Sequence, residues 1–335
     1  MRHFPYGAPT LRGRFKSRPE DFVVVETLGF EPDGHGEHLF IFVEKTGLAT
    51  PQLIECVARD FGCRSRDIGY SGLKDKQGIT RQWLSLPHSV ATPNGLPVGD
   101  GYRVLLHARH RRKLRPGTHK SNRFEVCLRE VAEFTAAGRA QLQCIEQRGF
   151  ANYFGEQRFG RQRDNVAQAL ASLSASRLPR WRRSLLLSAL RSHLFNRILS
   201  RRVESGRWLQ PIEGDVFMLR GSRSIFTETP DSELLRRFES LDISPTASLY
   251  GSGRCLLSGR ALGIENEIFA AEPEMTRCLD RHRAKRQMRP LRVAPSEMRY
   301  DYDAATQTLK LSASLPAGSY LSSLLDHFLE RIETD

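Results

Sequence analysis

The sequence predicts an α+β protein, and three observations lead to this expectation. Short β-branched or alternating runs that are typical of strands occur towards both ends of the chain, for example at 22–26 and 308–312. Residues 161–199 instead repeat apolar positions at the spacing of amphipathic helices. A chain of 335 residues is long enough for two domains, although one large domain would also fit. Mixed segments on both sides of a helix-rich stretch favour the α+β class.

The first 150 residues are expected to form mainly strands, with two helices between them. Thr50 is the predicted N-cap of the first helix, Pro51 its first-turn proline and Gly62 its end. Residues 87–101 are rich in Pro and Gly, so they are expected to form a loop. Further strands are expected at 38–44, 79–83, 102–108 and 123–129, and a further helix at 136–147.

The sequence pattern changes from mixed strand-like segments to a helix-rich stretch at about 150, and it changes back near 294. Two short strands are expected around a Gly-Ser turn, at 214–219 and 225–227. Arginines and a lysine between Arg281 and Arg289 indicate a basic helical patch, which Pro290 would end. Strand-like alternation returns at 299–302 and 308–312, and a helix from about 321 to 332 is expected to close the chain.

Composition narrows the functional classes. No apolar run is long enough for a membrane span, and the first residues lack the apolar core of a signal peptide. The six cysteines form no C-x-x-C pair, so we expect reduced thiols in a cytoplasmic protein and no zinc site. The net charge of +13 and the excess of arginine favour a polyanionic partner, because guanidinium groups bind phosphates in pairs of hydrogen bonds.

One motif places a carboxylate in a glycine-containing loop. The segment GLKDK at 72–76 presents Asp75 between two lysines and leads into the strand-like TRQW at 80–83. Neighbouring cations favour the ionised carboxylate, and a loop before a strand can present a reactive group. The alternative is a surface turn with solvated charges, which the local sequence alone favours.

A second motif gathers aromatic, amide and cationic residues within 152–160, which reads NYFGEQRFG. Such side chains could stack on nucleotides or hydrogen-bond to them. They could equally form a structural junction, with the aromatic rings in a core and the glycines turning the chain. Taken alone, the two interpretations are equally favoured.

The two motifs together resemble the TruD family of pseudouridine synthases. Its landmarks are a G-x-K-D-[KR] loop before a T-x-Q-W strand, and an N-Y-F-G-x-Q-R-F-G block. Further likeness at 19–26, 33–38, 108–114 and 316–320 extends the resemblance in order over nearly the whole chain. The positions that match the two motifs include Gly72, Lys74, Asn152, Tyr153, Phe154, Gln157 and Arg158.

The resemblance implies roles for individual residues. Asp75 matches the catalytic aspartate, expected to act as the nucleophile, and Lys16 is the candidate for its basic partner. Phe22, Asn122 and Tyr320 match positions that line the uracil pocket, and Phe124 is an aromatic residue on the same predicted strand as Asn122. Family members often have phenylalanine where this chain has Tyr320, which keeps a stacking face and adds a hydroxyl.

The resemblance also implies a domain organisation. A pseudouridine synthase catalytic domain with a mixed or antiparallel sheet would comprise 1–148 and 295–335. An α+β insertion domain that is specific to the family, the TRUD domain, would comprise 149–294.

The implied activity is the isomerisation of uridine to pseudouridine in tRNA, at position 13 of the D-arm, with glutamate tRNA as an expected substrate. The reaction breaks the bond from N1 to C1′ and rejoins the base through C5, so it needs no redox carrier, and we expect no cofactor and no metal. The target base must leave its stack to reach a closed pocket. Asp75 could attack C1′, attack C6 or remove the C2′ proton.

The expected partner is tRNA, bound by a monomer with no obligate protein partner. Arginine clusters at 109–115, 177–191 and 281–292 are candidates for phosphate contacts. Two other functions are compatible with parts of the pattern. An RNA chaperone on the same scaffold would bind tRNA without catalysis, and a metal-dependent ribonuclease would need further carboxylates or histidines near Asp75.

Overall fold

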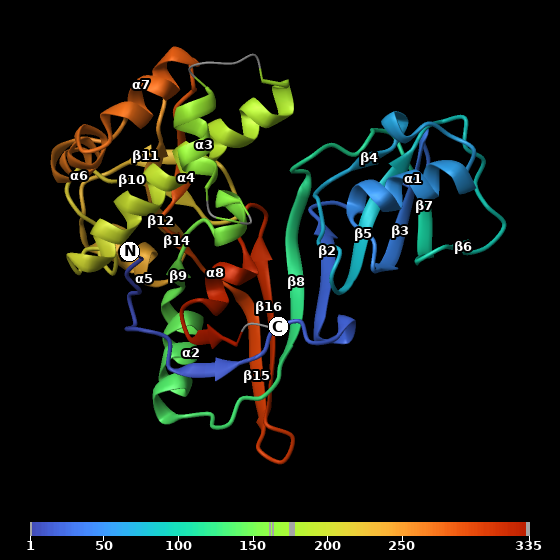
Figure 1. The fold of residues 1–335 in the computed structure, drawn as a ribbon, viewed down its shortest axis with the longest axis horizontal. Coiled ribbons are helices and arrows are strands. Elements are labelled where there is room, and N and C mark those ends of the chain that lie inside the picture. Colours follow the sequence, from blue (N-terminus) through green and yellow to red (C-terminus); the bar gives the residue numbers. More distant parts are fainter. Residues whose placement is uncertain (1, 161, 163, 174–177, 333–335) are drawn as a thin grey trace. The chain divides into compact units, whose positions relative to one another are not determined.

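The computed structural model describes residues 2–160, 162, 164–173 and 178–332, and the chain divides into two compact units (Figure 1). Unit 1 is formed by 1–9, 140–294 and 319–328. Unit 2 is formed by 10–139, 295–318 and 329–335. The units share the boundary at 294/295 with the predicted domains, but unit 1 also includes 1–9, 140–148 and 319–328. These compact units do not test the boundaries of the family domains, which remain a prediction.

Unit 2 is built on a nine-stranded sheet with the order β15-β16-β8-β2-β5-β3-β7-β6, and β4 pairs with β5 outside this path. Only β2 and β5 run parallel; the other pairs are antiparallel. The strands are β2 (Phe22–Leu28), β3 (His38–Thr46), β4 (Gly69–Tyr70), β5 (Ile79–Leu86), β6 (Val98–Gly99), β7 (Tyr102–His110), β8 (His119–Leu128), β15 (Ser296–Asp303) and β16 (Thr308–Pro316).

The two faces of this sheet have different cores because side chains alternate along each strand. Helix α1 (Thr50–Asp60) places Leu53 and Val57 against Ile41 and Leu84 on one face. We call this the α1 face. On the opposite face, Phe40 and Trp83 pack with Leu28 and Leu114.

The start of α1 differs from the prediction. Thr50 is not the N-cap but the first helical residue, and Ala49 precedes it. The Thr50 hydroxyl instead accepts the backbone N–H of Lys74 at 2.8 Å and donates to the side chain of Gln82 at 3.0 Å. Tertiary contacts therefore occupy the oxygen that a cap would need.

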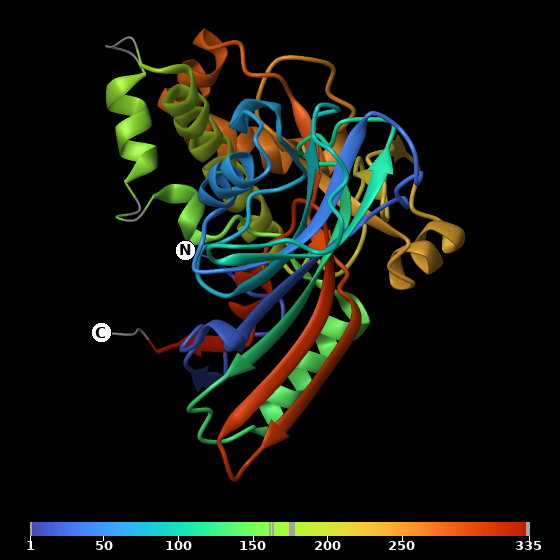
Figure 2. The same cartoon turned by 90° about the vertical axis from the view of Figure 1, so that its right-hand side faces the viewer.

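Strands β15 and β16 form a long hairpin, and β16 runs beside β8 along its whole length (Figure 2). A separate parallel pair joins the two ends of unit 2, because β1 (Leu11–Gly13) lies beside β17 (Leu329–Arg331). Two single-turn 3-10 helices complete the unit, at Pro19–Asp21 and Ser65–Asp67.

Unit 1 has helix α4 (Arg180–Glu204) near its centre. The buried side of α4 carries Phe195 and Ile198, which pack with Tyr153, Phe154 and Trp208 in one core.

The sheets of unit 1 are β11-β10-β12-β13 and β9-β14. The strands are β9 (Phe150–Ala151), β10 (Val216–Leu219), β11 (Ile225–Thr227), β12 (Ile243–Leu249), β13 (Gln287–Pro290) and β14 (Arg292–Val293). The other helices are α3 (Asn165–Ser172), α5 (Ser232–Glu239), α6 (Gly259–Ala270), α7 (Pro273–Arg281), α8 (Leu321–Leu325) and the 3-10 helix Glu156–Phe159. Helix α2 (Ala136–Arg148) begins in unit 2 and ends in unit 1.

One predicted helix is wrong, and another is predicted too long. The basic segment 281–289 leaves the helix at Arg281, turns at Arg283 (φ 50°) and becomes β13, because residues 287–290 pair with β12. The closing helix ends at Leu325 instead of continuing to 332, because residues 329–331 pair with β1. Residues 161, 163 and 174–177 of the predicted helical stretch, Arg177 among them, lie outside the described residues. Within the described part of the chain, no helix could cross a membrane.

Candidate active site

The predicted site residues of unit 2 meet on the α1 face of its sheet. In the register of β2 and β8, Val24 lies opposite Phe124 and Glu26 lies opposite Asn122. Since alternate residues share a face, Phe22, Glu26, Asn122 and Phe124 point to the same side. Val24 in turn lies beside Thr80 of β5, which places this side on the α1 face.

Asp75 lies in the loop between β4 and β5, and its side chain is 47% exposed. Lys16 Nζ donates to the Asp75 carboxylate at 2.8 Å. The same ammonium lies 4.1 Å from the centre of the Phe22 ring. The structure therefore brings the predicted basic partner, the carboxylate and one predicted pocket residue together.

Two predicted substrate-binding aromatic residues lie against each other. The rings of Phe22 and Phe124 are stacked, with centroids 6.3 Å apart and an interplanar angle of 21°. The rings of Phe15 and Phe22 are T-shaped to each other, with centroids 5.4 Å apart. Gly78 comes so close to Phe22 that a Cβ atom there would lie 2.4 Å from its carbonyl oxygen. Phe22 is therefore held from several sides next to Lys16.

The position of Lys74 beside Asp75 in the sequence suggests that it pairs with this carboxylate, but in the structure it pairs with other groups. Its ammonium pairs with Glu26 Oε2 at 2.9 Å and donates to the side-chain oxygen of Asn122. Both members of the ion pair are buried, with 6% and 0% of their side chains exposed. Burial raises the pKa of Glu26, and the Lys74 ammonium opposes that shift. Lys74 therefore orients Asn122, and Lys16 is the cation on Asp75.

Lys45 fixes the backbone of the Asp75 loop through hydrogen bonds. Its Nζ donates to the carbonyl oxygen of Asp75 at 2.7 Å and to that of Leu48 at 2.7 Å. Lys45 is 1% exposed, and this burial lowers its pKa to about 8. Sequence reasoning missed Glu26 and Lys45, because the burial of a charged side chain on a strand is not visible before the strands are paired.

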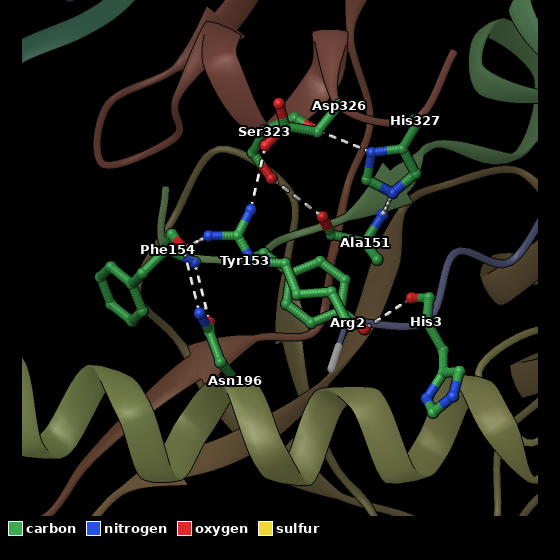
Figure 3. Close-up of polar contacts among 9 residues, drawn as sticks. All are labelled: Arg2, His3, Ala151, Tyr153, Phe154, Asn196, Ser323, Asp326 and His327. Carbon is green, nitrogen blue, oxygen red and sulfur yellow. Dashed lines mark hydrogen bonds and ion pairs between the residues drawn. The ribbon is translucent and has the colours of Figure 1, made fainter. Parts of the chain in front are cut away.

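The second motif lies in unit 1, and Figure 3 shows the contacts of its Tyr153 and Phe154. Tyr153 and Phe154 are 1% and 5% exposed in the core around α4. The Tyr153 hydroxyl donates to the carbonyl of His3 at 2.7 Å, and the amide of Asn196 bonds both backbone groups of Phe154. These rings are packed as a structural junction would require.

The remaining motif residues differ in their surroundings. Asn152 is buried, donates to the carbonyl of Pro290 at 2.8 Å and accepts from Arg289 at 2.6 Å. Arg158 donates to the Tyr320 hydroxyl at 2.7 Å, whereas Gln157 is exposed. The hydroxyl that distinguishes Tyr320 from phenylalanine therefore binds a motif arginine.

Comparison with known proteins gives the family. A family model described as "tRNA pseudouridine synthase D (TruD)" matches residues 1–172 and 165–328. The chain is 39% identical to the tRNA pseudouridine synthase D of Methylococcus capsulatus over 330 residues, which is 97% of this chain and 93% of the relative. It is also 39% identical to the protein of that name from Aeromonas salmonicida, over 98% of this chain and 94% of the relative.

The chain belongs to the TruD family. A solved structure from Methanosarcina mazei that carries the TruD name superposes with a TM-score of 0.72 at 20% identity, over 98% of this chain and 96% of that one. That likeness is one of fold, and it confirms the α+β class.

The TruD motif positions fall into both units. Asp75, Lys16, Phe22, Asn122 and Phe124 belong to unit 2, while Tyr320 belongs to unit 1. That Tyr320 lines a pocket together with Asp75 therefore remains a prediction. Over the described ranges, no group of three or more His, Cys, Asp or Glu side chains could hold a metal ion.

Proposed function

We propose that this TruD-family protein isomerises uridine to pseudouridine in tRNA, at position 13 of the D-arm, with Asp75 as the nucleophile. The observation that carries the proposal is the Lys16–Asp75 pair beside the stacked Phe22 and Phe124 rings. The comparisons support it, because the relatives that match over nearly their full length carry the name of this activity.

The chemistry of the reaction fits these side chains. Isomerisation breaks the bond from C1′ to N1 and forms a bond from C1′ to C5, while C5 loses a proton and N1 gains one. A carboxylate that a cation keeps ionised can act as the nucleophile. The detached uracil needs an aromatic surface and a polar partner for its edge, which Phe22 and Asn122 would supply. The buried Lys74–Glu26 pair would hold the Asn122 amide in one orientation.

The test uses unmodified tRNA and carbodiimide mapping of pseudouridine. The wild type should form one pseudouridine, at position 13, in glutamate tRNA, and Asp75→Asn should form none. Asp100→Asn is a matched control, because Asp100 is exposed and lies elsewhere in the same unit. If the wild type modifies no tRNA, and if the wild type and Asp75→Asn bind tRNA equally tightly, the results would instead favour the RNA chaperone.

A further inference from the structure

A second candidate site lies on the face of the unit 2 sheet that is opposite to Asp75. A cavity of about 990 Å³ opens there between the loop before β3 and the loop after β7. Its floor includes His38 and Phe40, which alternate with the α1-face residues of β3. Phe30, Asp33 and His110 line it on one side, and residues 111–115 line it on the other.

The wall formed by 111–115 is strongly basic. The cavity has four cationic side chains and two carboxylates, so positive charge is in excess. Arg111 is bound to Asp33 at 3.0 Å, and this contact lowers the pKa of Asp33 to about 2. Lys113 Nζ donates to the carbonyl of Arg66 at 3.3 Å. Within the described ranges, the exposed side chains of Arg112 and Arg115 have no partner, so they are available to an anion.

The cavity also has an aromatic surface. Phe30 stacks on His110 with centroids 4.9 Å apart and an interplanar angle of 23°, and Phe40 supports both rings from the core. Phe30 is 37% exposed, whereas Phe40 is fully buried. The His38 Nδ1 atom is also buried and has no hydrogen-bond partner in the described part of the chain. An open ring beside free guanidinium groups is suited to a base with its phosphate.

The residues that follow the basic wall are bonded to the segment that leads to Asp75. Gly117 donates its N–H to the carbonyl of Ser71 at 2.7 Å, and the Ser71 hydroxyl accepts the N–H of His119 at 2.7 Å. Leu114 is anchored separately, through its N–H, to the Ser85 hydroxyl at 3.0 Å. The cavity and the catalytic loop are thus parts of one hydrogen-bonded frame.

We propose that this cavity, the Arg112–Arg115 pocket, binds one unpaired nucleotide of the substrate RNA that is not the reacting uridine. Its base stacks on Phe30, and its phosphate contacts Arg112 and Arg115. This rests on the proposed function only in taking RNA as the substrate. The pocket contributes to binding and not to the chemical step, because its residues lie on the other face of the sheet from Asp75.

The first test measures binding apart from turnover. The double variant R112Q/R115Q and Phe30→Leu should each weaken tRNA binding about tenfold, measured by fluorescence anisotropy in the Asp75→Asn background. The slope of log Kd against log salt concentration should fall in the arginine variant by about 0.7 to 0.9 for each phosphate that it no longer binds. The matched control is R299Q/K310Q, which removes two exposed charges from β15 and β16 at the far end of the same sheet.

In the catalytically active background, the pocket variants should raise KM about tenfold and leave kcat within about twofold. Ultraviolet cross-linking of the Asp75→Asn complex should join a nucleotide other than the reacting uridine to the peptide that contains Phe30. Binding and turnover equal to the R299Q/K310Q control would overturn the proposal. The proposal would also be overturned if uridine 5′-monophosphate bound tightly at the pocket while the pocket variants bound tRNA as well as the wild type does. If the wild type makes no pseudouridine, the binding and cross-linking results still decide the matter of the pocket.

Discussion

The ammonium of Lys45 donates a hydrogen bond of 2.7 Å to the main-chain carbonyl of Asp75. A buried lysine is costly unless its donors are used, and here two backbone carbonyls accept them. The side chain of Asp75 is held from the other side by Lys16. One lysine thus fixes the backbone of the candidate nucleophile and another fixes its carboxylate.

Lys45→Met should reduce kcat on the order of 100-fold, because a displaced loop would misplace the carboxylate. The protein should also lose about 1–3 kcal/mol of stability, since two carbonyls lose their buried donor. Single-turnover rates and thermal unfolding measure the two effects. Lys76→Met is the control, because Lys76 is exposed in the same loop. A rate equal to that of the control would show that the loop keeps its place without Lys45.

Lys16→Met should separate catalysis from stability. Asp75 is nearly half exposed, so the ion pair should contribute less than about 1 kcal/mol to folding. The melting temperature should therefore change little, while kcat falls because the carboxylate loses its orienting cation. Lys16→Arg keeps the charge and should retain more activity than the methionine variant. Equal rates for the two variants would contradict a role for the cation.

The buried Lys74–Glu26 pair should behave as a coupled unit. Lys74→Met leaves the Glu26 carboxylate buried without its cation, which should cost on the order of 3 kcal/mol of unfolding free energy. Adding Glu26→Gln removes the unpaired charge and keeps an acceptor for the Trp83 N–H, so the double variant should recover part of that loss. Urea denaturation of the four proteins gives the coupling energy. Additive losses would mean that the two side chains act independently.

Unit 1 should lose stability in acid through His327 (Figure 3). Its Nε2 accepts the N–H of Ala151 at 3.0 Å, so the proton is on Nδ1, which donates to the carbonyl of Ser323 at 2.6 Å. Burial lowers the pKa of His327 from 6.5 to about 4. The unfolded chain therefore takes up a proton first as the pH falls, and stability decreases between about pH 6.5 and 4.

The expected loss from His327 between pH 7 and pH 5 is about 2 kcal/mol. Urea denaturation of the wild type and of His327→Gln at the two pH values measures it as a difference. His119, whose pKa is also lowered to about 4, is present in both proteins and cancels. The same pH dependence in both proteins would exclude His327 as the source.

Local sequence patterns predicted much of the fold. The β-branched run of β2 and the alternation of β8 are periodic signals that need no knowledge of the partner strand. The Asp75 loop was recognised from the spacing of two family motifs. The residues around it on β2 and β8 came from the same resemblance, and their shared face agrees with strand register.

What could not be predicted depends on contacts between distant residues. Glu26 and Lys45 are charged residues in strands, and only the fold gives each a buried partner. Residues 329–331 were expected to be helical because nothing near them in sequence indicates that they pair with 11–13. Likewise, β13 depends on its register with β12, which the basic composition of 281–289 does not reveal.

The pairing of β8 with β16 has a consequence for the way the chain is made. Strand β8 carries Asn122 and Phe124, but its partner at 308–316 leaves the ribosome only after the whole of 140–294 has been synthesised. At usual rates of translation, this edge waits roughly ten seconds or more for its neighbour. An unpaired edge is a template for wrong pairing with other chains. Nascent or truncated chains that end before residue 308 are therefore the forms of this protein that depend most on protection from aggregation.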